Sequence, residues 1–188
     1  HVGIPDTEQP ALFYVSMLAW VGCVADSPEV VSFFGDDIAF RADSYDADLG
    51  GLSGHRFFLS HAGAGQSFPR RLKAGATLLA TGGARVMQAI QSHCLTTSVL
   101  ADQLGLDADV SGALKQFFAR WDGQGVPPKV GGADLALSVR LFHLADVVEV
   151  HHRHGGLDAA TGVAQARRGK QFDPSLVDAF CAAAEDLV

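Results

Sequence analysis

The stretch that decides the fold lies near the end of the chain and reads Gly169-Lys170-Gln171-Phe172-Asp173-Pro174-Ser175-Leu176-Val177. Asp173 followed by Pro174 predicts the N-cap and first position of a closing helix over residues 175–187. Aspartate accepts hydrogen bonds from free backbone N–H groups, and proline fits the first helical turn. Phe172 precedes this N-cap and can pack against the start of the helix. The motif therefore predicts a helical end to the chain.

Helical patterns continue from this motif toward the N-terminus. Residues 135–152 should form a helix, Gly155-Gly156 should break it, and residues 157–168 should form a shorter helix. Further helices are expected at residues 7–24, with much of the circumference buried, and at 28–35, 68–80, 84–104 and 109–121, with a break at Gly82-Gly83. Residues 35–65 are rich in aspartate and glycine, which is typical of loops around short elements. No strand pattern is convincing, so the predicted fold class is all-α.

Composition and charge exclude several classes of protein. The 188 residues are 48% hydrophobic and 19% charged, as expected for one globular domain. A net charge of −7 argues against direct nucleic-acid binding by this chain. The most apolar helix candidate, 135–150, is interrupted by charged residues and predicts no membrane span. The three widely spaced cysteines, Cys23, Cys94 and Cys181, are typical of reduced thiols and predict a cytoplasmic location.

Three segments in order resemble the HD-GYP family, a branch of the HD superfamily that cleaves cyclic dinucleotides such as cyclic di-GMP. Arg120-Trp121-Asp122-Gly123-Gln124-Gly125-Val126-Pro127 resembles E-R-W-D-G-x-G-Y-P, with valine for tyrosine. Residues 141–147 resemble the helix with the A-D-V/A-F-D motif, and residues 169–177 resemble G-x-Q-F-D-P-x-L-V. The resemblance implies an HD-domain-like helical bundle. Residues 1–188 would form a single domain whose first family helix lies upstream of residue 1, with a longer loop-rich insertion at 25–85.

The resemblance also implies a centre of two or three iron or manganese ions that activate water. Only two of its ligand positions keep a suitable side chain, His93 and Asp146. The positions at which the family ligands are replaced are Ala19, Trp20, Phe117 and Phe118. One histidine and one carboxylate do not enclose two cations, and bulky apolar side chains would occupy the space of the ions. We therefore expect no cofactor.

The two remaining ligand positions also have structural interpretations. His93 can form hydrogen bonds within the core, and Asp146 can hold His143, three residues earlier on the same helix. The histidine-rich run 151–154 is expected to be a solvated helix end. Asp36-Asp37 is expected to serve as a turn and helix cap.

Two functions remain open. The first hypothesis is a non-catalytic regulatory domain that binds a small molecule or a protein partner, or pairs with a second copy as a homodimer. Segments 21–23 and 34–38 resemble the HD-type domains found beside helix-turn-helix modules in bacterial transcription regulators. The pocket of such a domain would involve Phe34, His61 and His143. The alternative is a cyclic-dinucleotide phosphodiesterase with a reduced iron or manganese site that uses His93 and Asp146. Bound metal would distinguish the two.

Overall fold

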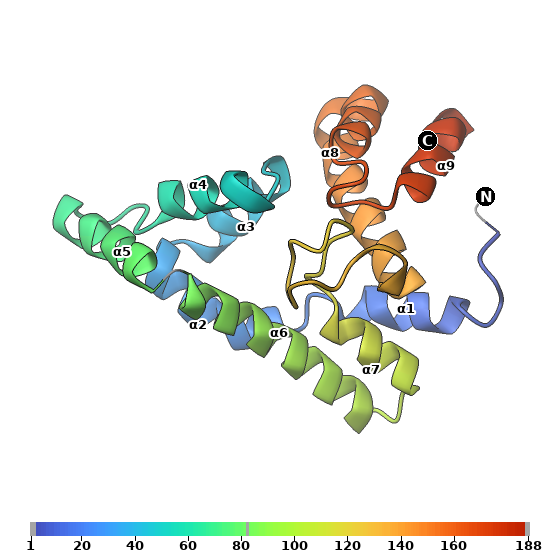
Figure 1. Ribbon diagram of the computed structural model, residues 1–188, viewed down its shortest axis with the longest axis horizontal. Coiled ribbons are helices and arrows are strands. Elements are labelled where there is room, and N and C mark those ends of the chain that lie inside the picture. Colours follow the sequence, from blue (N-terminus) through green and yellow to red (C-terminus); the bar gives the residue numbers. More distant parts are fainter. Residues whose placement is uncertain (1–2, 82, 187–188) are drawn as a thin grey trace.

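The computed structural model describes residues 3–81 and 83–186, in which the regular elements are helices (Figure 1). They are α1 (Gln9–Leu18), α2 (Cys23–Phe34), α3 (Asp37–Asp46), α4 (Gly51–His61), α5 (Phe68–Ala80), α6 (Ala84–Gln103), α7 (Ala108–Lys115), α8 (Leu137–Ala166) and α9 (Pro174–Ala183), with 3₁₀ turns at Gly132–Asp134 and Ala184–Asp186. The predicted all-α class is confirmed. Gly82 in the expected helix break and Leu187 at the expected chain end lie outside the described residues.

The C-terminal part follows the predicted helices closely. α8 holds both expected helices, separated by a kink at Gly156, where φ is 69° and ψ is −164°. α9 begins as expected, because the Asp173 side chain accepts a hydrogen bond from the Ser175 N–H and Pro174 occupies the first turn. Phe172, Leu176 and Val177 pack against buried residues of both arms of α8. Local signals along the chain were sufficient to predict this region.

The histidine run 151–154 lies at the end of the first arm of α8, just before the kink at Gly156, and only part of it is exposed. Nε2 of His151 is 3.2 Å from the backbone oxygen of Tyr45, and its side chain is largely buried. The expectation of a solvated helix end holds for Arg153 and His154 but was wrong for His151, because α3 lies against this part of α8.

The segment 116–121, expected as the second half of a helix, is irregular. α7 ends at Lys115, and the backbone of Phe118 then pairs with that of Val126. Gly125 permits this return of the chain, since a Cβ atom there would lie 2.4 Å from the Phe118 carbonyl oxygen. The prediction was wrong here because the loop folds back on the segment that precedes it.

The expected helix over residues 7–24 is two helices with a turn between them. Gly22 in this turn lies so close to His93 that a Cβ atom would be 2.5 Å from the imidazole ring. Much of the circumference of this segment was expected to be buried, but Phe13 and Met17 are 60% and 64% exposed. No single described helix is long and apolar enough to cross a membrane, and α1 with α2 meets the length and composition criteria only as a pair bent by 43°.

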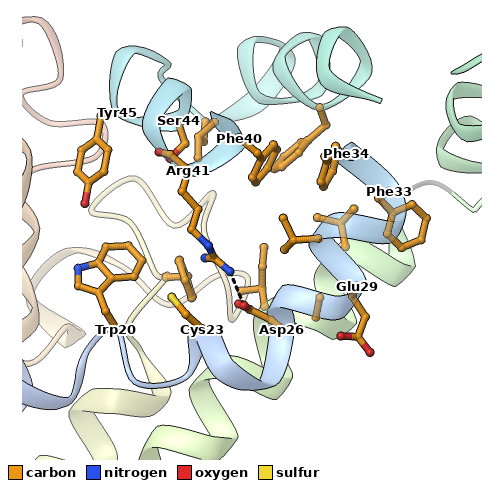
Figure 2. Close-up of a pocket in the computed structure, with 17 residues that line it drawn as sticks. Trp20, Cys23, Asp26, Glu29, Phe33, Phe34, Phe40, Arg41, Ser44 and Tyr45 are labelled. Atoms are coloured by element: carbon orange, nitrogen blue, oxygen red, sulfur yellow. Dashed lines mark hydrogen bonds and ion pairs between the residues drawn. The ribbon is translucent and has the colours of Figure 1, made fainter. Parts of the chain in front are cut away.

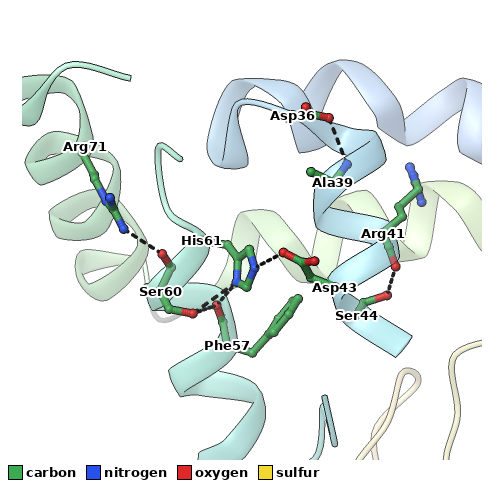
Figure 3. Close-up of polar contacts among 9 residues, drawn as sticks. All are labelled: Asp36, Ala39, Arg41, Asp43, Ser44, Phe57, Ser60, His61 and Arg71. Atoms are coloured by element: carbon green, nitrogen blue, oxygen red, sulfur yellow. Dashed lines mark hydrogen bonds and ion pairs between the residues drawn. The ribbon is translucent and has the colours of Figure 1, made fainter. Parts of the chain in front are cut away.

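The aspartate- and glycine-rich region is more helical than predicted. It forms α3 and α4, which lie with α5 on the side of the molecule away from α9 (Figure 1). Asp36 caps α3 by accepting a hydrogen bond from the Ala39 N–H at 3.0 Å, as expected (Figure 3). Phe34 and Phe40 stack with their ring centroids 4.1 Å apart, so that α3 covers the end of α2. This contact encloses one side of the cavity described below.

Candidate functional site

His93 on α6 is the buried centre of the site. Its side chain is fully buried, with Nδ1 3.0 Å from Asp26 Oδ2 and Nε2 2.7 Å from the Ala19 carbonyl oxygen. Both nitrogens face acceptors, so the ring donates to both when it carries two protons. Burial lowers the pKa of His93, but the hydrogen bonds to Asp26, Cys23 and Ala19 outweigh burial and raise it to about 9. The expectation of a hydrogen-bonded core histidine matches this geometry.

Asp26 on α2 joins His93 to a second cation. Its Oδ1 accepts a hydrogen bond from Nη2 of Arg41 at 2.5 Å, and the residue is only 4% exposed (Figure 2). Sequence reasoning missed Asp26, because its partners lie 15 and 67 residues away. A signal was available: Asp26, Val30 and Phe34 share the buried face of α2 at intervals of four residues. A carboxylate on such a face needs a buried partner.

Aromatic rings surround His93 where the resemblance places metal ligands. The His93 centroid is 6.2 Å from that of Trp20, 5.6 Å from Phe117 and 5.0 Å from Phe118. Ala19 contributes only its backbone carbonyl oxygen to the histidine. A two-metal iron or manganese centre requires several imidazole or carboxylate ligands around closely spaced ions. The residues at these positions do not fit such a centre.

Asp146 on α8 is separated from His93 by the indole of Trp20. Its Oδ2 accepts a hydrogen bond from the Tyr45 hydroxyl at 2.9 Å, and its Oδ1 accepts from Trp20 Nε1 at 3.4 Å. Burial raises the pKa of Asp146, although these two hydrogen bonds act in the opposite direction. The two remaining ligand positions therefore do not face one another across an open space.

The expected contact between Asp146 and His143 is not formed. Nε2 of His143 lies 2.5 Å from the Phe117 carbonyl oxygen. Nδ1 of His143 is buried and has no hydrogen-bond partner in the described part of the chain. Burial lowers the pKa of His143. The prediction was wrong because the irregular segment after α7 brings a backbone acceptor to this face of α8.

Trp20 lines two cavities. The first, of about 330 Å³, has a mainly apolar wall formed by residues such as Phe34, Phe40 and Phe58, and polar groups from Asp26 and Arg41 (Figure 2). The second, of about 140 Å³, is lined by groups that include Asp146, His143 and Arg120.

The structure separates the three residues expected to form one pocket. Phe34 lines the first cavity and His143 lines the second. His61 lines neither cavity and is instead held by Asp43 at 3.0 Å and by the Phe57 carbonyl oxygen at 2.9 Å (Figure 3). Arg41 and Tyr45, which sequence reasoning missed, bring α3 to the cavities.

Known proteins with similar sequences are phosphodiesterases, although no family model matches the chain. The 3′3′-cGAMP-specific phosphodiesterase 3 of Vibrio cholerae serotype O1 is 25% identical over 183 residues, which cover 95% of this chain and 40% of that protein. A probable cyclic di-GMP phosphodiesterase of the same organism is 37% identical over 67 residues, covering 32% of this chain and 15% of that protein. The chain thus spans less than half the length of these relatives.

Structure comparison gives the same result. The crystal structure of a cyclic GMP-AMP-specific phosphodiesterase of V. cholerae matches with a TM-score of 0.55 and 27% identity, covering 71% of this chain and 32% of that chain. The protein has an HD-like domain. Its similarity to phosphodiesterases supports a relationship to HD-domain phosphohydrolases, and fits the phosphodiesterase alternative better than the non-catalytic hypothesis.

Proposed function

We propose that this HD-like domain acts on cyclic dinucleotides, as a phosphohydrolase domain with a reduced metal site. The observation that carries the proposal is the similarity to a 3′3′-cGAMP-specific phosphodiesterase along 95% of the chain. The crystal structure of a cyclic GMP-AMP-specific phosphodiesterase is also similar to the structure of this chain, with a TM-score of 0.55. The substrate class is inferred from the substrates named for these relatives. We propose the same activity for any longer protein that contains this domain.

The first cavity has the chemistry that a nucleotide needs. Its phenylalanine rings offer faces on which a base can stack, and Arg41 offers a guanidinium that suits a phosphate. Its volume of about 330 Å³ is at the lower end of the range for small-molecule pockets. We therefore expect a cyclic dinucleotide to enter with one base and its phosphate, and to leave the rest of the molecule at the opening.

Hydrolysis by this domain would require a metal arrangement different from the two-metal centre. Iron or manganese, when bound, would supply the activation of water, but His93 and Asp146, the family-matched ligand positions, are separated by Trp20 and would not hold one ion between them. The chain's own residues would bind and orient the substrate: Arg41 would hold a phosphate, and Tyr45 would keep the Asp146 carboxylate in place.

Substrate turnover tests the proposal directly. The chain would be incubated with 3′3′-cGAMP or cyclic di-GMP and with Fe²⁺ or Mn²⁺, and the linear product would be quantified. We expect turnover that is lost in Asp146→Asn and retained in Asp178→Asn, a matched change in the exposed ion pair with Arg168. Absence of turnover with every metal, together with measurable binding of the dinucleotide, would contradict hydrolysis.

A second candidate, binding without hydrolysis, is favoured by the aromatic rings around His93. At three positions where the HD-GYP family has metal ligands, this chain has Trp20, Phe117 and Phe118, whose side chains offer no ligand atoms. In this case the domain would be a ligand-sensing part of a bacterial signalling or transcription-regulatory protein. Calorimetric binding of 3′3′-cGAMP, weakened by Arg41→Gln but not by the exposed-arginine control Arg56→Gln, with no product formed, would support this candidate.

A further inference from the structure

We propose that Cys23, Asp26 and His93 form a mononuclear site for zinc or a similar divalent cation beside the first cavity. One ligand atom from each of these side chains lies within 4.8 Å of the other two. The set shares only His93 with the ligand positions that the resemblance implies. It deepens the proposed function by giving the reduced metal site its residues, whereas binding of the ion does not itself depend on that function.

Two neighbouring helices supply the three ligands. Cys23 and Asp26 are three residues apart on α2 and therefore lie on the same face of that helix. His93 comes from α6, which packs along α2. The separation of 3.0 Å between His93 Nδ1 and Asp26 Oδ2 is close to the edge of about 3.3 Å expected between two ligands of a tetrahedral zinc ion. A small rotation of the Cys23 side chain would complete the three-ligand set.

The hydrogen bonds of His93 match those of a metal ligand. Nε2 lies 2.7 Å from the Ala19 carbonyl oxygen, the type of outer contact that fixes the tautomer of a metal-bound histidine and leaves Nδ1 as the ligand. Nδ1 and the Asp26 carboxylate are both acceptors once the Nδ1 proton is lost, so a cation that takes the place of this proton would prevent their repulsion. The metal would replace the Nδ1 proton of His93 and the thiol proton of Cys23, and both protons would pass to the solvent.

The ligand types select the metal. A cysteine thiolate with an imidazole favours zinc, whereas manganese and magnesium prefer oxygen ligands. Three protein ligands leave a fourth position of a tetrahedral ion open. Cys23 and Asp26 both line the first cavity, so this position would face the space in which we place the nucleotide phosphate.

Metal titration of the full chain, after removal of bound ions with a chelator, tests this site. Zn²⁺ binding would be measured by calorimetry, and Co²⁺ binding by the absorption band that a thiolate ligand produces. We expect one ion per chain and a thiolate band. Cys23→Ala should abolish the band and weaken Zn²⁺ binding by more than about 100-fold, since even outer contacts of metal ligands contribute 10- to 100-fold. Asp26→Asn should also weaken it.

Cys181→Ala is the matched control, because Cys181 is also a half-buried free cysteine but lies on α9. Circular dichroism would verify that each variant is folded. Zinc binding that is absent from the wild-type chain, unchanged in Cys23→Ala, or lost equally in Cys181→Ala would overturn the site. Zinc binding that is lost in Cys23→Ala, without any dinucleotide turnover, would support the metal site and contradict the hydrolytic function. Turnover with manganese, without any zinc binding, would support the hydrolytic function and contradict the metal site.

Discussion

Two clusters of buried polar groups in this molecule differ in how far apart their members lie in the sequence. In the motif cluster (Arg120, Asp122, Arg140, Asp173 and Ser175), Asp173 accepts from Ser175 and Asp122 from Arg120, both across two residues, while Arg140 donates to Asp173 across 33 residues. In the Trp20 cluster (Trp20, Asp26, Arg41, Tyr45, His93 and Asp146), the separations are 67 residues for Asp26 with His93 and 126 for Trp20 with Asp146.

The two clusters also differ in the parts of the molecule that they hold, although Arg120 of the motif cluster also lines the second cavity. The motif cluster caps α9 and shapes the loop after α7, and its short spacings make it recognisable in the sequence. The Trp20 cluster lines both cavities, and its members are brought together only by the packing of α2, α3, α6 and α8. We expect the two clusters to respond differently to substitution.

The largest effect is expected from Asp26→Ala in the Trp20 cluster. The change leaves the buried His93 and Arg41 without their shared carboxylate, and the free energy of unfolding should fall by about 3–5 kcal/mol. Urea unfolding in the presence of a chelator measures this. Asp43→Ala, which removes the ion pair between His61 and the exposed Asp43, should lose less than about 1 kcal/mol. Equal losses would mean that burial does not distinguish the two pairs.

Asp173→Ala should have the next largest effect, on the motif cluster. It removes the N-cap of α9 and leaves Arg140, 2.7 Å from Asp173, without its partner. We expect a loss of about 2–4 kcal/mol, which combines the cap and the ion pair. The control is Asp178→Ala, whose fully exposed ion pair with Arg168 should leave the stability almost unchanged. A loss below 1 kcal/mol for Asp173→Ala in urea unfolding would contradict the importance of this cap.

Tyr45→Phe is a smaller change within the Trp20 cluster. It removes the hydrogen bond of 2.9 Å to Asp146, which leaves the carboxylate with Trp20 alone. The expected loss is about 1.5–3 kcal/mol, typical of a hydrogen bond to a charged group. Chemical unfolding followed by circular dichroism measures the loss, with Tyr14→Phe at an exposed position as control. An unchanged free energy of unfolding would show that a water molecule can replace the Tyr45 hydroxyl as hydrogen-bond donor to Asp146.

The smallest effect is the pH dependence of the motif cluster. Burial alone would raise the pKa of Asp173, but hydrogen bonds from Ser175 and Arg140 outweigh it and lower the pKa. A lowered pKa in the folded protein gives stability that is present above the unfolded value of about 3.9 and is lost as pH falls through the folded value. The stability difference between wild type and Asp173→Asn should therefore narrow on acidification. A difference that widens in acid would contradict this.

The resemblance located part of the candidate site, and packing supplied the rest. His93 and Asp146 were identified from matched motifs, but Asp26, Arg41 and Tyr45 were not, because their partners come from other helices. The insertion at 25–85, the iron or manganese alternative and a homodimer stay predictions.

The sequence by itself determined the all-α class, the limits of α5, the start and body of α6, the break at Gly156 and the start of α9. These features depend on caps, turns and hydrophobic spacing within one stretch of chain. Only the tertiary structure decided that 116–121 is irregular, that Phe13 is exposed and that Asp26 meets His93. The physical reason is that burial and the pairing of distant polar groups depend on how the helices pack, whereas helix ends depend on hydrogen bonds between near neighbours.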